Sequence, residues 1–205
     1  MELMDFRSFW RGTLAVFLWG FAGQAQVIEF ESNGLKYDTL TKSGVTIMFA
    51  QMPTHVHDYA ILQVAISNGS GGPWTIRPED FTFERKDGRS VRAAAANSVV
   101  RNLIAKAGRN DVMHLIETYE QGLYGLTQFK STNGYDQRRQ GYLAVGSSAK
   151  LKAAAAASAI ALVMTKLSPK ESTDGAVFLP LAHKGSLGEG HLVVRAGGET
   201  FDFSQ

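Results

Sequence analysis

Two histidines and an aspartate in the segment His55-Val56-His57-Asp58 form a local group that could ligate a metal ion. On an extended chain, side chains two residues apart point to the same face, so both imidazoles could reach one divalent ion. Asp58 or a distant carboxylate would complete the coordination. The alternative is a solvated loop, because Pro53 and the start of a long strand flank the segment. The remaining histidines, in other segments, are His114, His183 and His191.

Two further motifs suit loops and helix caps better than catalysis. The run Gly185-Ser186-Leu187-Gly188-Glu189-Gly190 resembles a phosphate loop, but such loops open onto a helix, whereas these glycines lead into a predicted strand. Ser147 and Lys150 have serine–lysine spacing before a helix, where serine commonly acts as the cap. The sequence therefore predicts no catalytic set and no cofactor.

A cluster of aromatic and aliphatic residues gives the chain a candidate partner-binding surface. Its members are Tyr119, Leu123, Tyr124, Leu126 and Phe129. Apolar side chains that gather on a surface are typical of sites that bind proteins. We therefore expect a protein or an envelope component as the partner, while the oligomeric state does not follow from the sequence.

Composition excludes several classes of protein. The 205 residues are 44% hydrophobic and 20% charged, as in ordinary globular chains, and the net charge is +2. This balance argues against a strongly basic nucleic-acid-binding protein and against a charged disordered tail. The chain has no cysteine, which excludes disulfides, thiol catalysis and cysteine-bound zinc.

The first 25 residues have the features of a signal peptide. Arg7 and Arg11 precede an uncharged, largely apolar run over residues 12–23, and the small residues Gly23 and Ala25 fit cleavage after Ala25. About twelve residues give about 18 Å of helix, too short for a hydrocarbon core of about 30 Å. Alternatives are a retained anchor or a buried helix. Export without cysteine favours a bacterial periplasmic or secreted protein, with no transmembrane span in the mature chain.

Residues 27–96 have the alternation of β-strands. Apolar residues recur at every second position, as in Val45, Ile47 and Phe49, and glycine-rich turns separate the runs. Asn68-Gly69-Ser70 matches a glycosylation acceptor, but it opens one of these turns, so a turn is the better interpretation. Regular turns between alternating strands are typical of an antiparallel sandwich or barrel.

Residues 97–168 break this pattern. Val99 and Leu103 recur at helical spacing, and a second helix is expected from Asn110 or Asp111. The alanine-rich stretch from Ala149 to Leu167 predicts a buried helix that is too short to cross a membrane.

The strand pattern returns in residues 169–205. We therefore expect a mainly β, α+β fold, with residues 26–205 as one antiparallel β-sandwich domain. Its strands would come from residues 27–96 and 169–205, interrupted by a helical insertion at 97–168. The C-terminal strands alone are too few to bury a sheet face, which argues against two separate domains.

Several of these strands resemble a known group of domains. Tyr59–Asn68 followed by Ile76–Phe81 resembles the strand-turn-strand core of bacterial exported immunoglobulin-like domains. Leu167–Ser172 followed by Gly175–Phe178 is similar to their leucine-x-proline-glycine-glutamate turn and next strand, with Lys170 in place of the usual glycine. The resemblance implies an immunoglobulin-like fold and a role in envelope binding or assembly, and it brings no catalytic residues.

These observations together favour a non-catalytic exported module that binds or assembles a component of a bacterial envelope. The enzymatic alternative is an exported metal-dependent hydrolase that uses His55, His57 and Asp58. A third hypothesis is peripheral membrane association through the alanine-rich helix.

Overall fold

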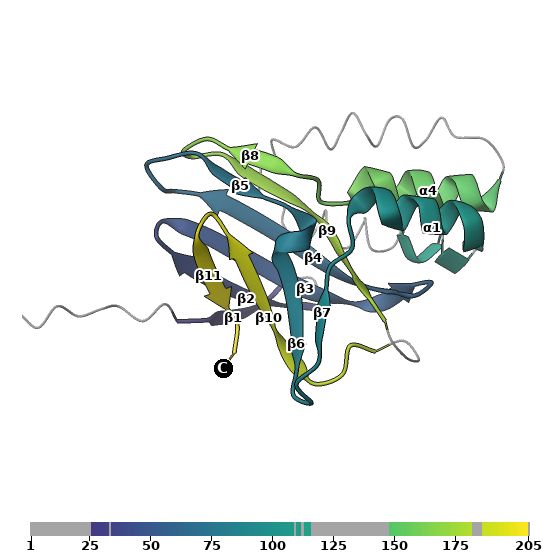
Figure 1. Cartoon of the computed structure of the whole chain (residues 1–205), viewed down its shortest axis with the longest axis horizontal. Coiled ribbons are helices and arrows are strands. Elements are labelled where there is room, and N and C mark those ends of the chain that lie inside the picture. Colours follow the sequence, from purple (N-terminus) through teal and green to yellow (C-terminus); the bar gives the residue numbers. More distant parts are fainter. Residues whose placement is uncertain are drawn as a thin grey trace, which may run out of the picture.

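The computed structural model describes residues 26–32, 34–108, 110–111, 113–115, 148–181 and 186–204. These residues form a mainly antiparallel β structure with three sheets and a group of helices (Figure 1). The coarse prediction of a mainly β, α+β chain is confirmed. Residues 1–25 lie outside the described part, so the signal peptide stays a prediction from sequence.

The largest sheet has five antiparallel strands in the order β1-β2-β3-β4-β9. Their bounds are Ile28–Ser32, Leu35–Lys42, Val45–Val56, Tyr59–Asn68 and Ser172–Pro180. The expected Ser43-Gly44 turn joins β2 to β3, with positive φ angles of 50° and 79°. β9 pairs with β4 over its whole length, so strands far apart in the sequence share one sheet.

A second sheet has four strands in the order β11-β10-β6-β7, and a third pairs β5 with β8. The bounds are Glu199–Asp202, Gly190–Ala196, Phe81–Arg85 and Ser90–Arg92, and then Trp74–Ile76 and Thr165–Leu167. A short 3-10 helix, η1, covers Pro78–Asp80. β10 pairs with β6, which again joins the two ends of the chain.

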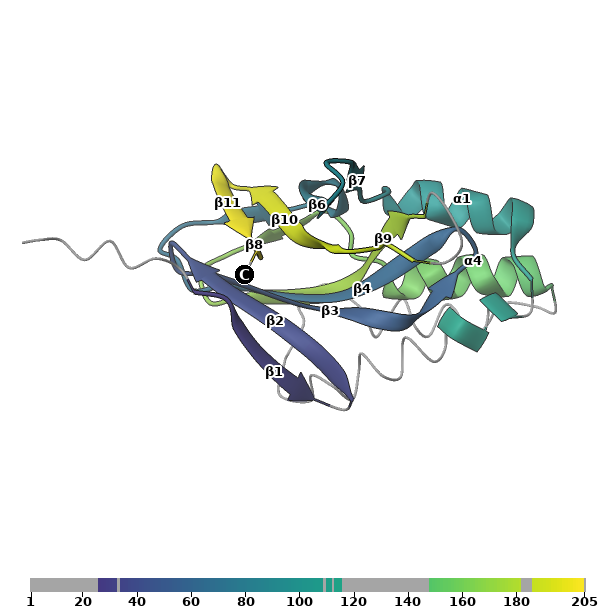
Figure 2. The ribbon, with the colours of Figure 1, turned by 90° about the horizontal axis from the view of Figure 1, so that it is seen from below.

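Apart from the mostly exposed edge strand β1, the five-stranded sheet contributes to a core on each face, because successive side chains of a strand point to opposite sides. On β4, Leu62, Val64 and Ile66 share a core with side chains of the four-stranded sheet. Tyr59 and Ile61, on the other face, share a second core with α1 and α4. α1 covers Ala96–Lys106 and α4 covers Ala149–Ile160. Figure 2 shows the two helices together, near the β3–β4 hairpin.

α4 is shorter than the sequence predicts, since it ends at Ile160 and not at Leu167. Leu162 donates its backbone N–H to the Ala176 carbonyl of β9 at 2.8 Å, so the chain leaves the helix to pair with the sheet edge. Gly175 permits this crossing, because a Cβ there would lie 2.7 Å from the Leu162 nitrogen. β8 then forms at Thr165–Leu167, inside the range 97–168 that was expected to be helical.

α4 is buried along much of its length, mainly through alanines that allow close packing against α1. No helix in the described part of the chain is both long enough and apolar enough to cross a membrane.

Asn68 lies at the expected turn after β4 and is fully buried. Its side-chain amide donates to the carbonyls of Gly72 at 2.8 Å and Leu167 at 3.0 Å, and its side-chain oxygen accepts from Ser70. These bonds hold the turn against β8, so the residue has a structural role, as the turn interpretation requires.

A second turn, Ser168-Pro169-Lys170-Glu171, leads into β9. The Glu171 N–H donates to the Ser168 carbonyl at 3.1 Å, and Lys170 has a φ of 71°. A proline at the second position and a positive φ at the third position are the features of a type II turn. Glycine is the favoured residue at that third position.

Candidate functional site

The candidate metal ligands lie at the tip of the β3–β4 hairpin. β3 ends at Val56 and β4 begins at Tyr59, so His57 and Asp58 form a two-residue turn, in which His57 has a φ of 50°. The prediction that His55 and His57 share one face of an extended strand is wrong, because the chain reverses direction at His57.

The hairpin tip is joined to the helical residues that follow α1. The carboxylate of Asp111 accepts the His57 N–H at 2.8 Å and the Gly108 N–H at 2.8 Å. The His57 Nε2 lies 3.1 Å from the Asp58 Oδ2. These contacts fix the turn. They also engage both carboxylate oxygens of Asp111 and the Oδ2 of Asp58.

His114 approaches His55, which the sequence could not reveal because the two lie in different segments. Its Nδ1 is 2.9 Å from the His55 carbonyl oxygen, and the two ring centroids are 6.4 Å apart. Among the described residues, no group of three or more His, Cys, Asp or Glu side chains is arranged to hold a metal ion. For the metal hypothesis, the described residues thus supply the neighbouring histidines His55 and His114 but no third ligand beside them.

Two other sequence motifs are placed only in part. The predicted partner-binding cluster lies outside the described residues, and its members are Tyr119, Leu123, Tyr124, Leu126 and Phe129. Of the glycine-rich run, residues 186–188 have no regular structure and Gly190 begins β10. A Cβ at Gly190 would overlap the Glu84 carbonyl, so this glycine allows β10 to approach β6.

A groove of about 720 Å³ is lined by residues of β1, β2 and β3 and by residues of β6 and β10. Figure 2 shows that β1 and β2 diverge from β6 and β10. The register of the five-stranded sheet explains the mixed lining of the groove. Glu29, Asp38 and Phe49 are successive cross-strand neighbours on β1, β2 and β3, followed by Val64 on β4. The face that packs on the second sheet therefore changes from apolar at its centre to charged at its β1 edge.

Three phenylalanines line the apolar side of this inter-sheet groove: Phe49, Phe83 and Phe203. Phe83 and Phe203 are 8% and 4% exposed, and the rings of Phe49 and Phe203 meet edge to face with centroids 4.9 Å apart. Phe49 is only partly buried, so its ring offers a ligand both apolar area and an electronegative face.

Charged side chains form the rim of the inter-sheet groove, and most of them are paired. The Lys36 ammonium lies 2.7 Å from the Glu29 carboxylate, and the Lys86 ammonium lies 2.8 Å from the Glu189 carboxylate. Asp38 differs, because none of the described residues donates a hydrogen bond to its buried Oδ1. Desolvation by burial, together with the neighbouring Glu29 carboxylate, raises the pKa of Asp38.

No protein-family model and no curated protein matches this chain. Among solved structures, it has a similarity to the crystal structure of the yjhA protein from Bacillus subtilis. The identity is 9%, the match covers 82% of this chain and 76% of that chain, and the TM-score is 0.32. A likeness this distant supports no conclusion on fold or function.

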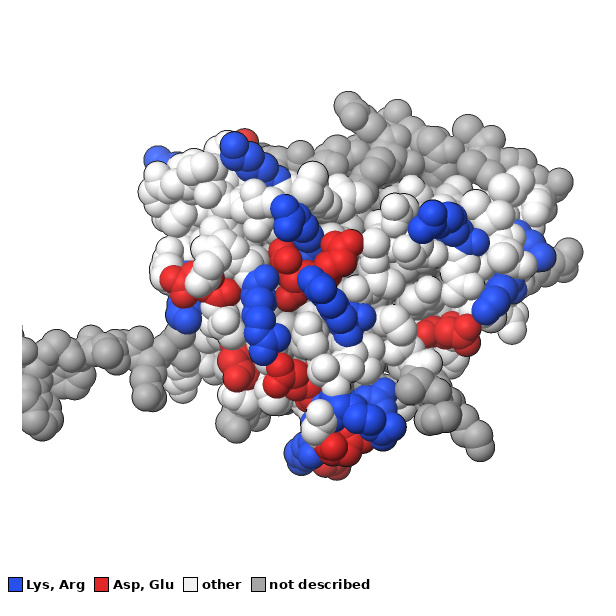
Figure 3. Space-filling model, in the orientation of Figure 1, with Lys and Arg blue, Asp and Glu red and all other residues white. Residues whose placement is uncertain are grey.

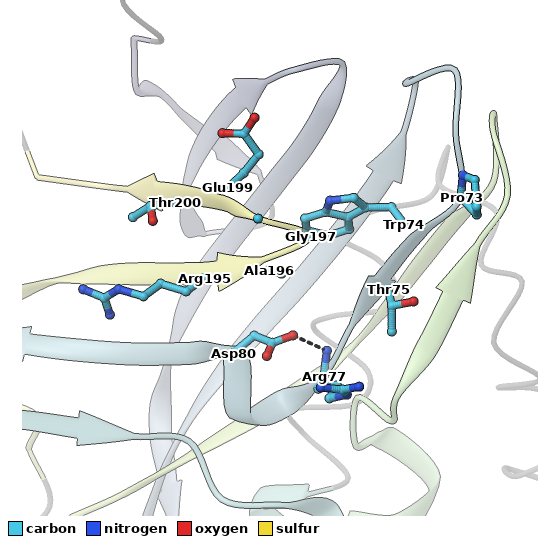
Figure 4. Close-up of a pocket in the computed structure, with 11 residues that line it drawn as sticks. Pro73, Trp74, Thr75, Arg77, Asp80, Arg195, Ala196, Gly197, Glu199 and Thr200 are labelled. Atoms are coloured by element: carbon cyan, nitrogen blue, oxygen red, sulfur yellow. Dashed lines mark hydrogen bonds between the residues drawn. The ribbon is translucent and has the colours of Figure 1, made fainter.

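A second depression, of about 640 Å³, lies beside the β10–β11 hairpin (Figure 4). The Trp74 indole packs on Gly197, where a Cβ would overlap the ring. Asp80 accepts the Arg77 N–H at 2.8 Å, and burial raises the pKa of its carboxyl group. Figure 4 shows that the side chains of Arg77 and Arg195 extend in different directions, so they do not converge on one ligand.

Opposite charges alternate over the outer face of β6, β7 and β10 (Figure 3). Arg195 pairs with Glu84 at 2.9 Å, and Arg92 donates to the Glu79 carbonyl at 2.5 Å. Neighbouring positive and negative groups satisfy one another there, as on many solvated sheet faces. The inter-sheet groove, with its aromatic side and unpartnered carboxylate oxygen, is the better candidate site.

Sequence reasoning missed the inter-sheet groove because its lining comes from five strands and the chain end. Strand alternation does mark Phe49, Phe83 and Phe203 as apolar positions, but pairing order and register decide which of them meet.

Proposed function

We propose that this protein is an exported bacterial binding or assembly module that holds its partner in the inter-sheet groove and has no catalytic role of its own. The observation that carries the proposal is the groove itself, with three phenylalanines on one side and a charged rim on the other. Concave sites that combine aromatic area with a few polar groups are typical of ligand-binding sites.

The proposed architecture is an immunoglobulin-like β-sandwich interrupted by a helical segment. Its support is the core shared by the five-stranded and four-stranded sheets, and the pairing of β9 with β4. A further support is the turn at Pro169, where Lys170 has the positive φ that suits the glycine of the exported domains.

Export is supported by the sequence of residues 1–25. Basic residues, a short apolar run and small residues at Gly23 and Ala25 occur in the order that signal peptidase requires. The partner would then be a protein or another component of the periplasm, envelope or medium.

Affinity capture from bacterial envelopes and medium tests the proposal. Gln51 is exposed and lines the inter-sheet groove, so Gln51→Trp adds bulk there without removing a core side chain. Lys106→Trp, at an exposed position on α1, is the matched control. We expect the wild type and Lys106→Trp to capture the same specific partner and Gln51→Trp to lose it. Equal capture by all three proteins would overturn the proposal.

A further inference from the structure

The described charges of the inter-sheet groove leave one carboxylate outside its ion pairs. Among its Lys, Arg, Asp and Glu side chains, two ion pairs account for Glu29, Lys36, Lys86 and Glu189. Among the described lining residues, Asp38 is the remaining one; the nearby Lys36 ammonium attracts it but forms its ion pair with Glu29. A groove with a single uncompensated carboxylate favours a ligand with a single positive charge, because like charges and neutral groups leave that carboxylate unpaired.

The position of Asp38 also limits the shape of the ligand. Asp38 and Phe49 are directly opposite each other on β2 and β3, which places their Cβ atoms about 4.5–5.5 Å apart. A cation that donates a hydrogen bond to the Asp38 carboxylate therefore lies within reach of the Phe49 ring. The face of such a ring attracts cations. Phe203 extends the aromatic surface beyond Phe49.

We propose that the inter-sheet groove binds a primary ammonium group carried on an apolar stem, with the ammonium on Asp38 and the stem on Phe49 and Phe203. This inference rests on the proposed binding role of the groove. Because the Asp38 Oδ1 is buried, at most one oxygen of this carboxylate is open to a ligand in the groove. An ammonium is a compact charge that can pair with one oxygen, whereas the planar fork of a guanidinium pairs best with two oxygens side by side.

Ligand titrations followed by NMR on the full chain test this inference. The probes are 2-phenylethylammonium, its neutral analogue 2-phenylethanol and the anion 3-phenylpropionate. We expect the ammonium to bind at least about tenfold more tightly than the neutral probe, because a hydrogen bond to a charged group contributes that much. A capped peptide with one central lysine distinguishes a polypeptide source of the ammonium from a small amine.

Three variants make the test specific. Asp38→Asn should weaken ammonium binding by about 10- to 100-fold and leave 2-phenylethanol unchanged, whereas Asp38→Glu should retain the preference for the cation. Asp87→Asn removes an exposed carboxylate at the β6–β7 hairpin, outside the groove, and should leave the affinity for every probe unchanged. The amide spectrum and thermal midpoint of each variant show that it is folded.

Equal affinity for the cationic and neutral probes, no binding of any probe, or unchanged ammonium binding in Asp38→Asn would overturn the inference. The binding role of the groove is judged separately, by the loss of partner capture in Gln51→Trp. If that loss occurs while Asp38→Asn binds ammonium normally, the ammonium preference is wrong and the proposed function stands.

Discussion

At the scale of single residues, Asp38 makes an unfavourable contribution to folding. Burial and the Glu29 carboxylate raise its pKa above the unfolded value, so the ionised form is disfavoured in the folded protein. Stability therefore falls as pH rises from about 3.9, the unfolded value, through the raised pKa. Above that pH range, the folded protein bears the whole free-energy cost of keeping Asp38 ionised.

Asp38→Asn should therefore stabilise the protein at pH 7, by up to about 1 kcal/mol because solvent still screens part of the carboxylate. The gain should disappear near pH 3, where the wild-type group is protonated. Denaturant unfolding at both pH values measures this. Asp87→Asn is the control, and it should lower the free energy of unfolding at pH 7. Hydrogen bonds from Arg89 lower the pKa of Asp87, so its ionised form is favoured in the folded protein. Equal effects of Asp38→Asn at the two pH values would contradict the assignment.

Lys170 occupies a backbone conformation that suits glycine. Its φ of 71° costs a side-chain-bearing residue about 1–2 kcal/mol, while glycine adds about 0.5–1 kcal/mol of unfolded-state entropy. Lys170→Gly should thus raise the free energy of unfolding by about 0.5–1 kcal/mol. Lys166→Gly, an exposed lysine within β8, should lower it. Chemical denaturation compares them, and a destabilised Lys170→Gly would argue against this turn.

Residue types alone predicted some of these roles. The turn at Asn68 followed from a glycine-rich run, and Pro169 marked the turn at Lys170. The positive φ of His57 was not predictable, since the β3–β4 register decides that this residue enters the two-residue turn. Likewise, the unpartnered Asp38 oxygen depends on pairing across three strands.

At the scale of elements, the crossing of the α4 exit over β9 depends on Gly175. A Cβ there would lie 2.7 and 2.8 Å from Leu162 backbone atoms, which have no freedom to move aside because Leu162 is hydrogen-bonded to Ala176. Gly175→Ala should destabilise the protein by about 1–3 kcal/mol, the usual cost of overpacking. Gly71→Ala, with nothing within 4 Å of the added Cβ, is the control.

Thermal unfolding and amide hydrogen exchange check this prediction. Exchange should accelerate first at the end of α4 and in β9 of Gly175→Ala, because the crossing joins these two elements. If Gly175→Ala and Gly71→Ala unfold alike, the close crossing does not exist in solution.

The elements themselves were predicted with uneven success. Period-two alternation located β3 and β4, and alanine propensity located α4. The end of α4 was placed too late because Leu162, Val163 and Met164 suit a helix by composition, while the pairing with β9 is a tertiary contact. The strand β8 was missed for the same reason.

At the scale of the whole molecule, different layers cover the two faces of the five-stranded sheet over β2, β3, β4 and β9, while β1 is mostly exposed. The sequence predicted that strands from both ends of the chain would pair, and β4–β9 and β6–β10 do so. It did not predict that α1 and α4 would form a second core on the far face, since periodicity shows an apolar stripe and not the surface it covers.

Export gives a prediction for the intact chain. If residues 1–25 are a signal peptide, expression of the whole sequence in a bacterium should release a mature protein that begins at Gln26. Intact-mass spectrometry of the periplasmic fraction and medium measures the first residue. Replacing Ala25 by a bulky residue, as in Ala25→Trp, should block cleavage. A cytoplasmic product that retains Met1 would contradict export.

Site-specific photocrosslinking tests most directly the claim that the inter-sheet groove is the binding surface. A photoreactive phenylalanine analogue is placed at Gln51 in the groove, or at Lys106 on α1, in the organism that makes the protein. We expect a discrete crosslinked adduct from position 51 that is absent from position 106. No adduct from position 51, or the same adduct from both positions, would contradict the account.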